Sequence, residues 1–168
     1  MWFNESHIAC IAPPFNSEDV RVEVTTNDFD YTENKIVYEY RESPIILSIS
    51  PSMGSTDGGT EVTVHGTGFV FSSLLSCAFG NVLSAASFIN STTVTCLTPR
   101  NNALSVVPVW IMANGLDRST SDAVVHYSYV PLPIVTSIEP TSGPRTRSTT
   151  ITVSGNLFVN TSSLSCRF

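Results

Sequence analysis

An internal repeat is the feature that most constrains what this chain can fold into. The chain matches itself without a gap from Pro44 to Phe79 at a constant displacement, which places Pro44 on Pro133. The matched positions include prolines, glycines, a phenylalanine and a cysteine: Pro51 with Pro140, Gly54 with Gly143, Gly66 with Gly155, Phe69 with Phe158 and Cys77 with Cys166. Because each unit in a series needs its own core, this pattern predicts an array of small domains.

The repeat also predicts the domain boundaries. Before Pro44 the displacement is slightly shorter, and a loop of different length explains the change. It matches Asn4 with Asn90 and Cys10 with Cys96. We therefore expect three segments: the C-terminal half of one domain (1–43), a complete domain (44–130) and the N-terminal half of a further domain (131–168). On this interpretation the chain is an internal piece of a longer protein, and its partial domains should aggregate or pair between chains.

Composition and residue pattern favour strands throughout. Charged residues make up only 13% of the 168 residues, and apolar residues alternate with polar ones in short runs, as at Val62 and Val64. No stretch has sustained helical periodicity, so we expect an all-β protein of tandem β-sandwiches, one complete and two partial. The net charge of −6 argues against a nucleic-acid surface, which needs Lys and Arg to neutralise phosphates.

The four cysteines follow the repeat. Cys77 and Cys96 lie in the complete domain and are expected to form a disulfide, whose loop of about 20 residues would stabilise it by roughly 3 kcal/mol. Cys10 and Cys166 match Cys96 and Cys77, so both are expected to be unpaired here. The alternative is four buried free thiols, as in a cytosolic protein.

Three sequons for N-glycosylation are candidates for modification: Asn4, Asn90 and Asn160. Asn4 and Asn90 occupy equivalent positions in successive repeats, which favours a glycan more than an isolated match does. Unmodified surface asparagines are the alternative at each site. With the cysteines, the sequons predict an extracellular or cell-surface parent protein. No apolar run approaches the roughly 18 residues of a membrane span, the first residues do not resemble a signal peptide, and membrane anchoring of the parent is left open.

The complete domain also carries a distinctive order of motifs. It has Pro51 and Gly54, then Gly58-Gly59-Thr60, Val62 and Val64, Gly66-Thr67-Gly68-Phe69, Cys77 to Gly80, and Val94 to Pro99. This order resembles the IPT/TIG family of immunoglobulin-like domains, found in plexins, the hepatocyte growth factor receptor group and some transcription factors. The resemblance implies tandem immunoglobulin-like sandwiches of about seven strands, of the cell-surface receptor or secreted type. In the last copy Arg147, Ser148 and Leu157 replace glycines, and looser turns are expected there.

Trp110 and Met112 are the candidates for contact with a partner. In the repeat, Val109 and Ile111 match the inward-facing Val22 and Val24, so Trp110 is expected to point outward with Met112 on the same side. An outward Trp beside Met is typical of a contact surface. The alternative is that a loop, a glycan or a neighbouring domain covers it.

The sequence predicts no reaction, cofactor or metal site. Its three histidines form no spacing typical of a catalytic or metal site, and Asn27 to Asp30 lack the glycine and glutamate of an EF-hand. We expect a non-catalytic interaction, adhesion or stalk module that contacts a protein ligand, neighbouring domains of its own chain or glycans, and no nucleic acid. The alternatives are a carbohydrate-binding accessory module of a secreted enzyme, with Trp110 as its platform, and a Rel-like DNA-binding domain.

Overall fold

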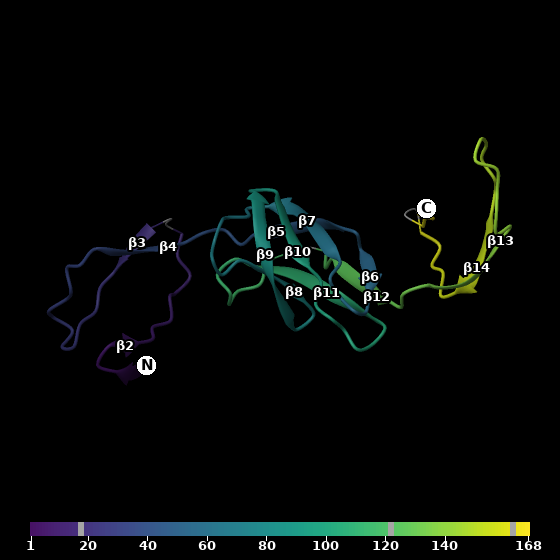
Figure 1. The fold of residues 1–168 in the computed structure, drawn as a ribbon. Helices are drawn as coiled ribbons and strands as arrows, with labels where there is room; N and C mark the ends of the chain where they lie inside the picture. Colours follow the sequence, from purple (N-terminus) through teal and green to yellow (C-terminus); the bar gives the residue numbers. More distant parts are fainter. Residues whose placement is uncertain (17–18, 121–122, 162–163) are drawn as a thin grey trace. The chain divides into compact units, whose positions relative to one another are not determined.

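A computed structural model of the chain describes residues 1–16, 19–120, 123–161 and 164–168 (Figure 1). Within these residues the secondary structure consists of strands and contains no helix. The chain divides into two units, Met1–Glu42 and Ser43–Phe168. The second unit contains a complete sandwich and, after it, a separate two-stranded hairpin.

Eight strands form the sandwich. They are β5 (Ile45–Ser50), β6 (Met53–Ser55), β7 (Glu61–Thr67), β8 (Ser76–Phe79), β9 (Val82–Asn90), β10 (Thr93–Leu97), β11 (Ser105–Met112) and β12 (His126–Val130). Their hydrogen-bonded order is β5-β7-β10-β9-β8-β11-β12-β6. All neighbours are antiparallel except β12 and β6, which are parallel.

The long strand β9 joins the two layers of the sandwich. Its first residues, 82–85, pair with β8, and its later residues, 86–90, pair with β10. One layer therefore contains β5, β7 and β10, and the other contains β8, β11, β12 and β6. Both β5 and β6 are edge strands, so the sheet folds over on itself without closing into a barrel.

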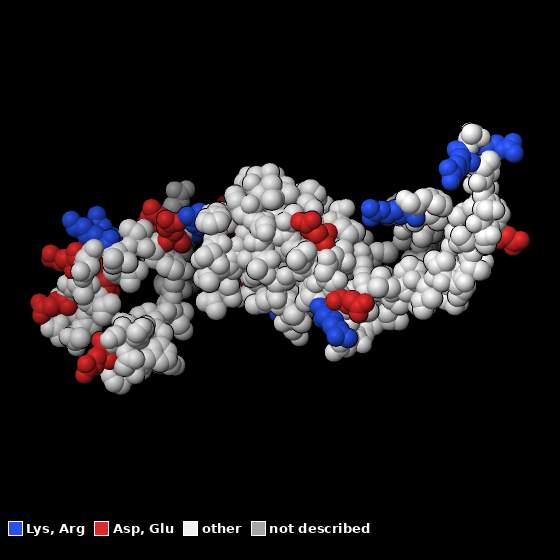
Figure 2. All heavy atoms as spheres, in the orientation of Figure 1, with Lys and Arg blue, Asp and Glu red and all other residues white. Residues whose placement is uncertain are grey.

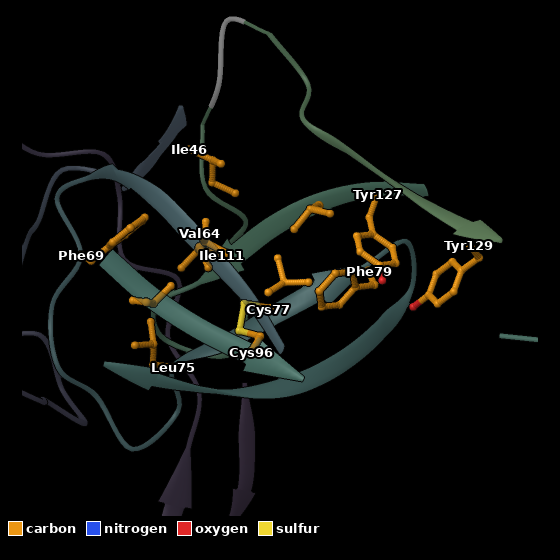
Figure 3. Close-up of a cluster of buried hydrophobic side chains, with 13 residues drawn as sticks. Ile46, Val64, Phe69, Leu75, Cys77, Phe79, Cys96, Ile111, Tyr127 and Tyr129 are labelled. Carbon is orange, nitrogen blue, oxygen red and sulfur yellow. A yellow bond between two sulfur atoms is a disulfide. The ribbon is translucent and has the colours of Figure 1, made fainter. Parts of the chain in front are cut away.

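The core lies between the layers, and its residues come from alternate positions of the strands (Figure 3). On β7, Val62 and Val64 are fully buried, whereas Glu61 and His65 are exposed, as the alternation predicted. Beyond β7 the chain bends at Gly66 and Gly68, and Phe69 enters the core with 2% of its surface exposed. A Cβ atom on Gly66 would overlap the carbonyl oxygen of Ile45 and the ring of Phe69, so only glycine fits there.

The C-terminal hairpin repeats this arrangement. It consists of β13 (Ile134–Glu139) and β14 (Thr152–Asn156), paired antiparallel. A Cβ atom on Gly155 would overlap the carbonyl oxygen of Ile134 and the ring of Phe158, as at Gly66. Leu157, which replaces the second glycine of the bend, keeps a left-handed backbone with φ 65°, close to the 74° of Gly68. The left-handed backbone of the bend is therefore retained at this position.

The N-terminal unit repeats the later strands of the sandwich, β9 to β12. It contains β1 (Trp2–Asn4), β2 (His7–Ile8), β3 (Asp19–Val22) and β4 (Ile36–Glu39). The phenol of Tyr40 donates a hydrogen bond to the carbonyl of Pro13 (2.7 Å), and the equivalent Tyr129 donates to the equivalent Pro99 (3.0 Å). The repeat in sequence is thus also a repeat of tertiary contacts.

A turn built on an asparagine side chain recurs in the same way. Asn27 Oδ1 accepts hydrogen bonds from two following backbone amides, and Asn27 Nδ2 donates to Asp30 (2.7 Å). Asn114 makes the same bonds in the sandwich, with Asp117 in place of Asp30 (2.8 Å). The Asn27 to Asp30 segment is therefore held by its own side chains, as expected of a solvated turn.

Candidate interaction surface

A disulfide connects the two layers of the sandwich. Cys77 on β8 and Cys96 on β10 are bonded, with their Cα atoms 6.3 Å apart and both residues buried (Figure 3). The bridge therefore joins strands that are not neighbours in the sheet. Cys10 and Cys166, their counterparts in the flanking segments, are free and exposed. The pairing expected from the repeat is present in the structure.

Trp110 lies on the outer side of β11. Its neighbours Val109 and Ile111 are buried in the core, as predicted, and Trp110 itself is half-buried. It stands opposite Ala78 of β8, which in turn pairs with Leu83 of β9. Directly paired residues have side chains on the same face, so the three form a row across three strands. Leu83 is 53% exposed and Trp110 is half-buried, whereas Ala78 between them is buried, so Leu83 and Trp110 supply the outward-facing apolar surface.

The prediction that Met112 shares this exposed face is wrong. Met112 is only 7% exposed. After Met112 the chain reverses at Asn114 and runs back along β11, so that Met112 bridges to Arg118. Ser119 anchors the returning segment, because its hydroxyl accepts a hydrogen bond from the amide of Ile111 (3.0 Å) and its own amide donates to the carbonyl of Ile111 (2.7 Å). Met112 is therefore buried, and the returning segment pairs with the backbone beside it.

The same loop places Arg118 over Trp110. The guanidinium carbon lies 4.2 Å from the centroid of the Trp110 ring, which is cation–π geometry. We define the Trp110 surface as Leu83, Trp110 and Arg118. It combines apolar area with an exposed cation, a pairing that is common at protein interfaces. Sequence reasoning missed Arg118, whose only signal was the Asn114-Gly115 turn that returns the chain to β11.

The sequons at Asn4 and Asn90 lie at exposed turns between paired strands, β1–β2 and β9–β10. Asn160 is also exposed, but its sequon includes Ser162, which lies outside the described residues. Over the middle sandwich, the face seen in Figure 2 carries few charged side chains.

No group of three or more His, Cys, Asp or Glu side chains among the residues that the structure describes is arranged to hold a metal ion. Nor does any helix there have the length and apolar character needed to cross a membrane.

Two antiparallel layers that share one strand and surround a cross-linked core define an immunoglobulin-like sandwich. The chain belongs to the IPT/TIG domain family, whose sequence model matches residues 44–129 and 133–168.

The chain is similar to short parts of much longer proteins. It is 32% identical to mouse fibrocystin-L over 133 residues, which is 74% of this chain and 3% of that protein. It is 30% identical to mouse plexin-A2 over 114 residues, which is 67% of this chain and 6% of that protein. Among solved structures, the full extracellular region of plexin A4 superposes with a TM-score of 0.53 at 22% identity, over 74% of this chain and 11% of that one. This last similarity shows the fold alone.

Proposed function

We propose that the chain is a non-catalytic length of an extracellular array of immunoglobulin-like domains, which acts as an interaction, adhesion or stalk module of a larger cell-surface or secreted protein. The observation that carries this proposal is the buried Cys77–Cys96 bridge in a sandwich with repeated structure on both sides. Disulfides form and persist in oxidising compartments. One of the similar structures is itself an extracellular region.

The proposed array has one complete domain, residues 44–130, between two partial ones, 1–43 and 131–168. The repeated contacts support these limits. Tyr40 repeats the bond of Tyr129 in the first segment, and Gly155 repeats the packing of Gly66 in the last. The family match over 133–168 supports the last segment independently.

The hydrogen bonds of two buried hydroxyls support a non-catalytic module. Thr98 and Ser119 are buried polar side chains of the described residues, and the buried hydroxyl of Tyr127 has no hydrogen-bond partner there. Thr98 Oγ1 accepts a hydrogen bond from the amide of Thr60 (3.1 Å), and Ser119 Oγ accepts one from Ile111 (3.0 Å). The hydroxyls of Thr98 and Ser119 therefore serve the backbone.

We propose that the Trp110 surface contacts a protein partner or a neighbouring domain of the parent chain. A carbohydrate platform needs a free aromatic face, and Arg118 stacks on Trp110. A DNA-binding surface needs clustered cations, whereas residues 44–130 contain two arginines and no lysine. No observation favours either of these alternative functions.

Peptide mapping of the secreted chain under non-reducing conditions tests the location. The expected result is a Cys77–Cys96 cross-linked peptide, and recovery of both residues as alkylatable thiols would overturn the proposal.

The proposed contact at the Trp110 surface is tested by binding of the tagged chain to a panel of soluble ectodomains. Trp110→Ala and Arg118→Ala should each weaken capture roughly tenfold or more, whereas the exposed control Leu104→Ala should not. Retention on polysaccharide that is lost in Trp110→Ala, or tight salt-sensitive duplex binding, would favour the alternatives.

A further inference from the structure

The turn between β9 and β10 presents a sequon in a defined geometry. Asn90 is the last residue of β9, and its Oδ1 accepts hydrogen bonds from the amide (2.9 Å) and the hydroxyl (2.8 Å) of Thr92. Both bonds use the oxygen of the side-chain amide. Nδ2, the atom to which an N-linked sugar attaches, is not used by either, and the residue is exposed.

The turn is fixed to the rest of the sandwich. The carbonyl of Ser91 accepts a hydrogen bond from the amide of Phe69 (3.1 Å), and the carbonyl of Thr92 accepts one from Gly66 (3.0 Å). Gly66 and Phe69 belong to the bend that closes the core. A group attached to Asn90 would therefore start from a rigid position beside the loop that follows β7.

Two aromatic rings belong to the same end of the sandwich. Phe88, two residues before Asn90, is half-buried against the core, and the ring of Phe71 meets it edge-on at 6.2 Å between centroids. Phe71 is 74% exposed, although exposure of a large aromatic side chain to water is unfavourable in free energy. Pyranose rings have an apolar face of C–H groups that stacks on aromatic rings, so a sugar that reached Phe71 would cover its exposed ring.

The preceding repeat has the same turn. Asn4 pairs with His7 and Trp2 with Ile8, as Asn90 pairs with Thr93 and Phe88 with Val94. Both hairpins have a register shift beside the asparagine. Asn4 Oδ1 accepts a hydrogen bond from the amide of Ser6 (2.9 Å), and Trp2, at the position of Phe88, is 70% exposed.

From these observations we infer that Asn90 carries an N-linked glycan whose first sugar packs on Phe71 and Phe88, and that Asn4 carries one at the equivalent turn. The donor is an oligosaccharide activated as a lipid diphosphate. A bond forms between Nδ2 and the anomeric carbon, the bond from that carbon to the phosphate oxygen breaks, the lipid diphosphate leaves, and Nδ2 loses a proton. The inference rests on the proposed extracellular location, because this chemistry belongs to the secretory pathway.

Occupancy is tested on residues 1–168 secreted from mammalian cells, by mass spectrometry before and after enzymatic release of N-glycans. Asn90 and Asn4 should be predominantly glycosylated. Thr92→Ser should retain the glycan at Asn90, and Thr92→Ala should lose it while keeping the backbone bond to Gly66. An unmodified Asn90 in secreted protein with an intact Cys77–Cys96 bridge would overturn this inference and leave the proposed location standing, whereas free thiols would overturn the location.

The packing of the sugar has a separate readout. Trimming the glycans to the first sugar should leave the melting temperature unchanged, and removing that sugar should lower it by a few degrees. In Phe71→Ala, removing the first sugar should change the melting temperature little. In the exposed control Leu104→Ala, the decrease in melting temperature should equal that of the wild type. An equal decrease in wild type and Phe71→Ala would overturn the packing.

Discussion

Gly58 and Gly59 are adjacent residues with nearly the same backbone, φ 76° and 77°, but their surroundings differ. A Cβ atom on Gly58 would lie 2.7 Å from backbone atoms of Thr98, Pro99 and Arg100, whereas a Cβ atom on Gly59 would meet nothing within 4 Å. Both positions favour glycine because the left-handed region disfavours a side chain. At Gly58, but not at Gly59, the backbone that follows β10 also lies too close to leave room for a side chain.

The two glycines therefore give a matched pair of variants. Gly59→Ala should lower the free energy of unfolding of residues 44–130 by about 1 kcal/mol, the cost of a left-handed L-residue. Gly58→Ala should lower it by about 3 kcal/mol or more, because the backbone after β10 must also move. Urea denaturation measures both, and equal losses would show that the backbone contact at Gly58 has no energetic importance.

Tyr129 gives the domain a dependence on alkaline pH. Burial, and in second place the proximity of Tyr127, raises the pKa of the Tyr129 phenol to about 12, from the usual value of about 10. The unfolded chain then releases the proton at a lower pH than the folded domain. Stability should be fully present below about pH 10 and should decrease as the pH rises from there to about 12.

The urea midpoint of residues 44–130 measured across this pH range tests the prediction. Tyr129→Phe removes the titrating phenol and its hydrogen bond to Pro99. The variant should therefore have a lower urea midpoint at neutral pH, but its midpoint should decrease less as the pH rises. Parallel pH profiles for the two proteins would contradict the assignment to Tyr129.

At the scale of elements, local pattern predicted the strands of the core but not what lies on the outer faces. The alternation at Val62 and Val64 and the entry of Phe69 into the core are properties of short segments, and the structure confirms them. The parallel pairing of β6 with β12 and the position of Arg118 depend on residues far along the chain or on a loop reversal. Alternation along β11 therefore could not show that Met112 is buried whereas Trp110 is not.

The disulfide should contribute strongly to the stability of the sandwich, because it connects strands in different layers. In the chain-entropy model, a loop with a sequence separation of 19 residues gives about 3 kcal/mol. The double variant Cys77→Ala/Cys96→Ala should lower the free energy of unfolding by about that amount in denaturant titrations. Cys10→Ala/Cys166→Ala removes the same number of sulfurs from exposed sites and should leave the transition of the sandwich unchanged. Equal effects of the two double variants would contradict a stabilising bridge.

At the scale of the whole molecule, equivalent residues differ in burial between the middle sandwich and the flanking segments. Phe158 is 42% exposed whereas Phe69 is 2% exposed, and Tyr38 is 44% exposed whereas Tyr127 is fully buried. The side chains are the same, so the difference lies in the strands around them: eight in the sandwich, and two in each sheet that the structure describes in the flanking segments. The N-terminal unit repeats contacts of β9 to β12, and the C-terminal hairpin repeats those of β5 and β7. The two segments thus supply complementary parts of one sandwich.

This complementarity predicts that the 168-residue chain self-associates, with the C-terminal segment of one copy pairing with the N-terminal segment of another. Sedimentation velocity should show oligomers that grow with concentration for residues 1–168 and a monomer for residues 44–130.

Where the C-terminal segment of one copy pairs with the N-terminal segment of another, Cys166 and Cys10 take the positions of Cys77 and Cys96. Mild oxidation should therefore produce a covalent ladder on non-reducing gels. Cys10→Ser should remove the ladder but not the association, because the exposed apolar faces remain. A chain that stays monomeric at high concentration, with protected amides in both flanking segments, would show instead that each segment folds without a partner.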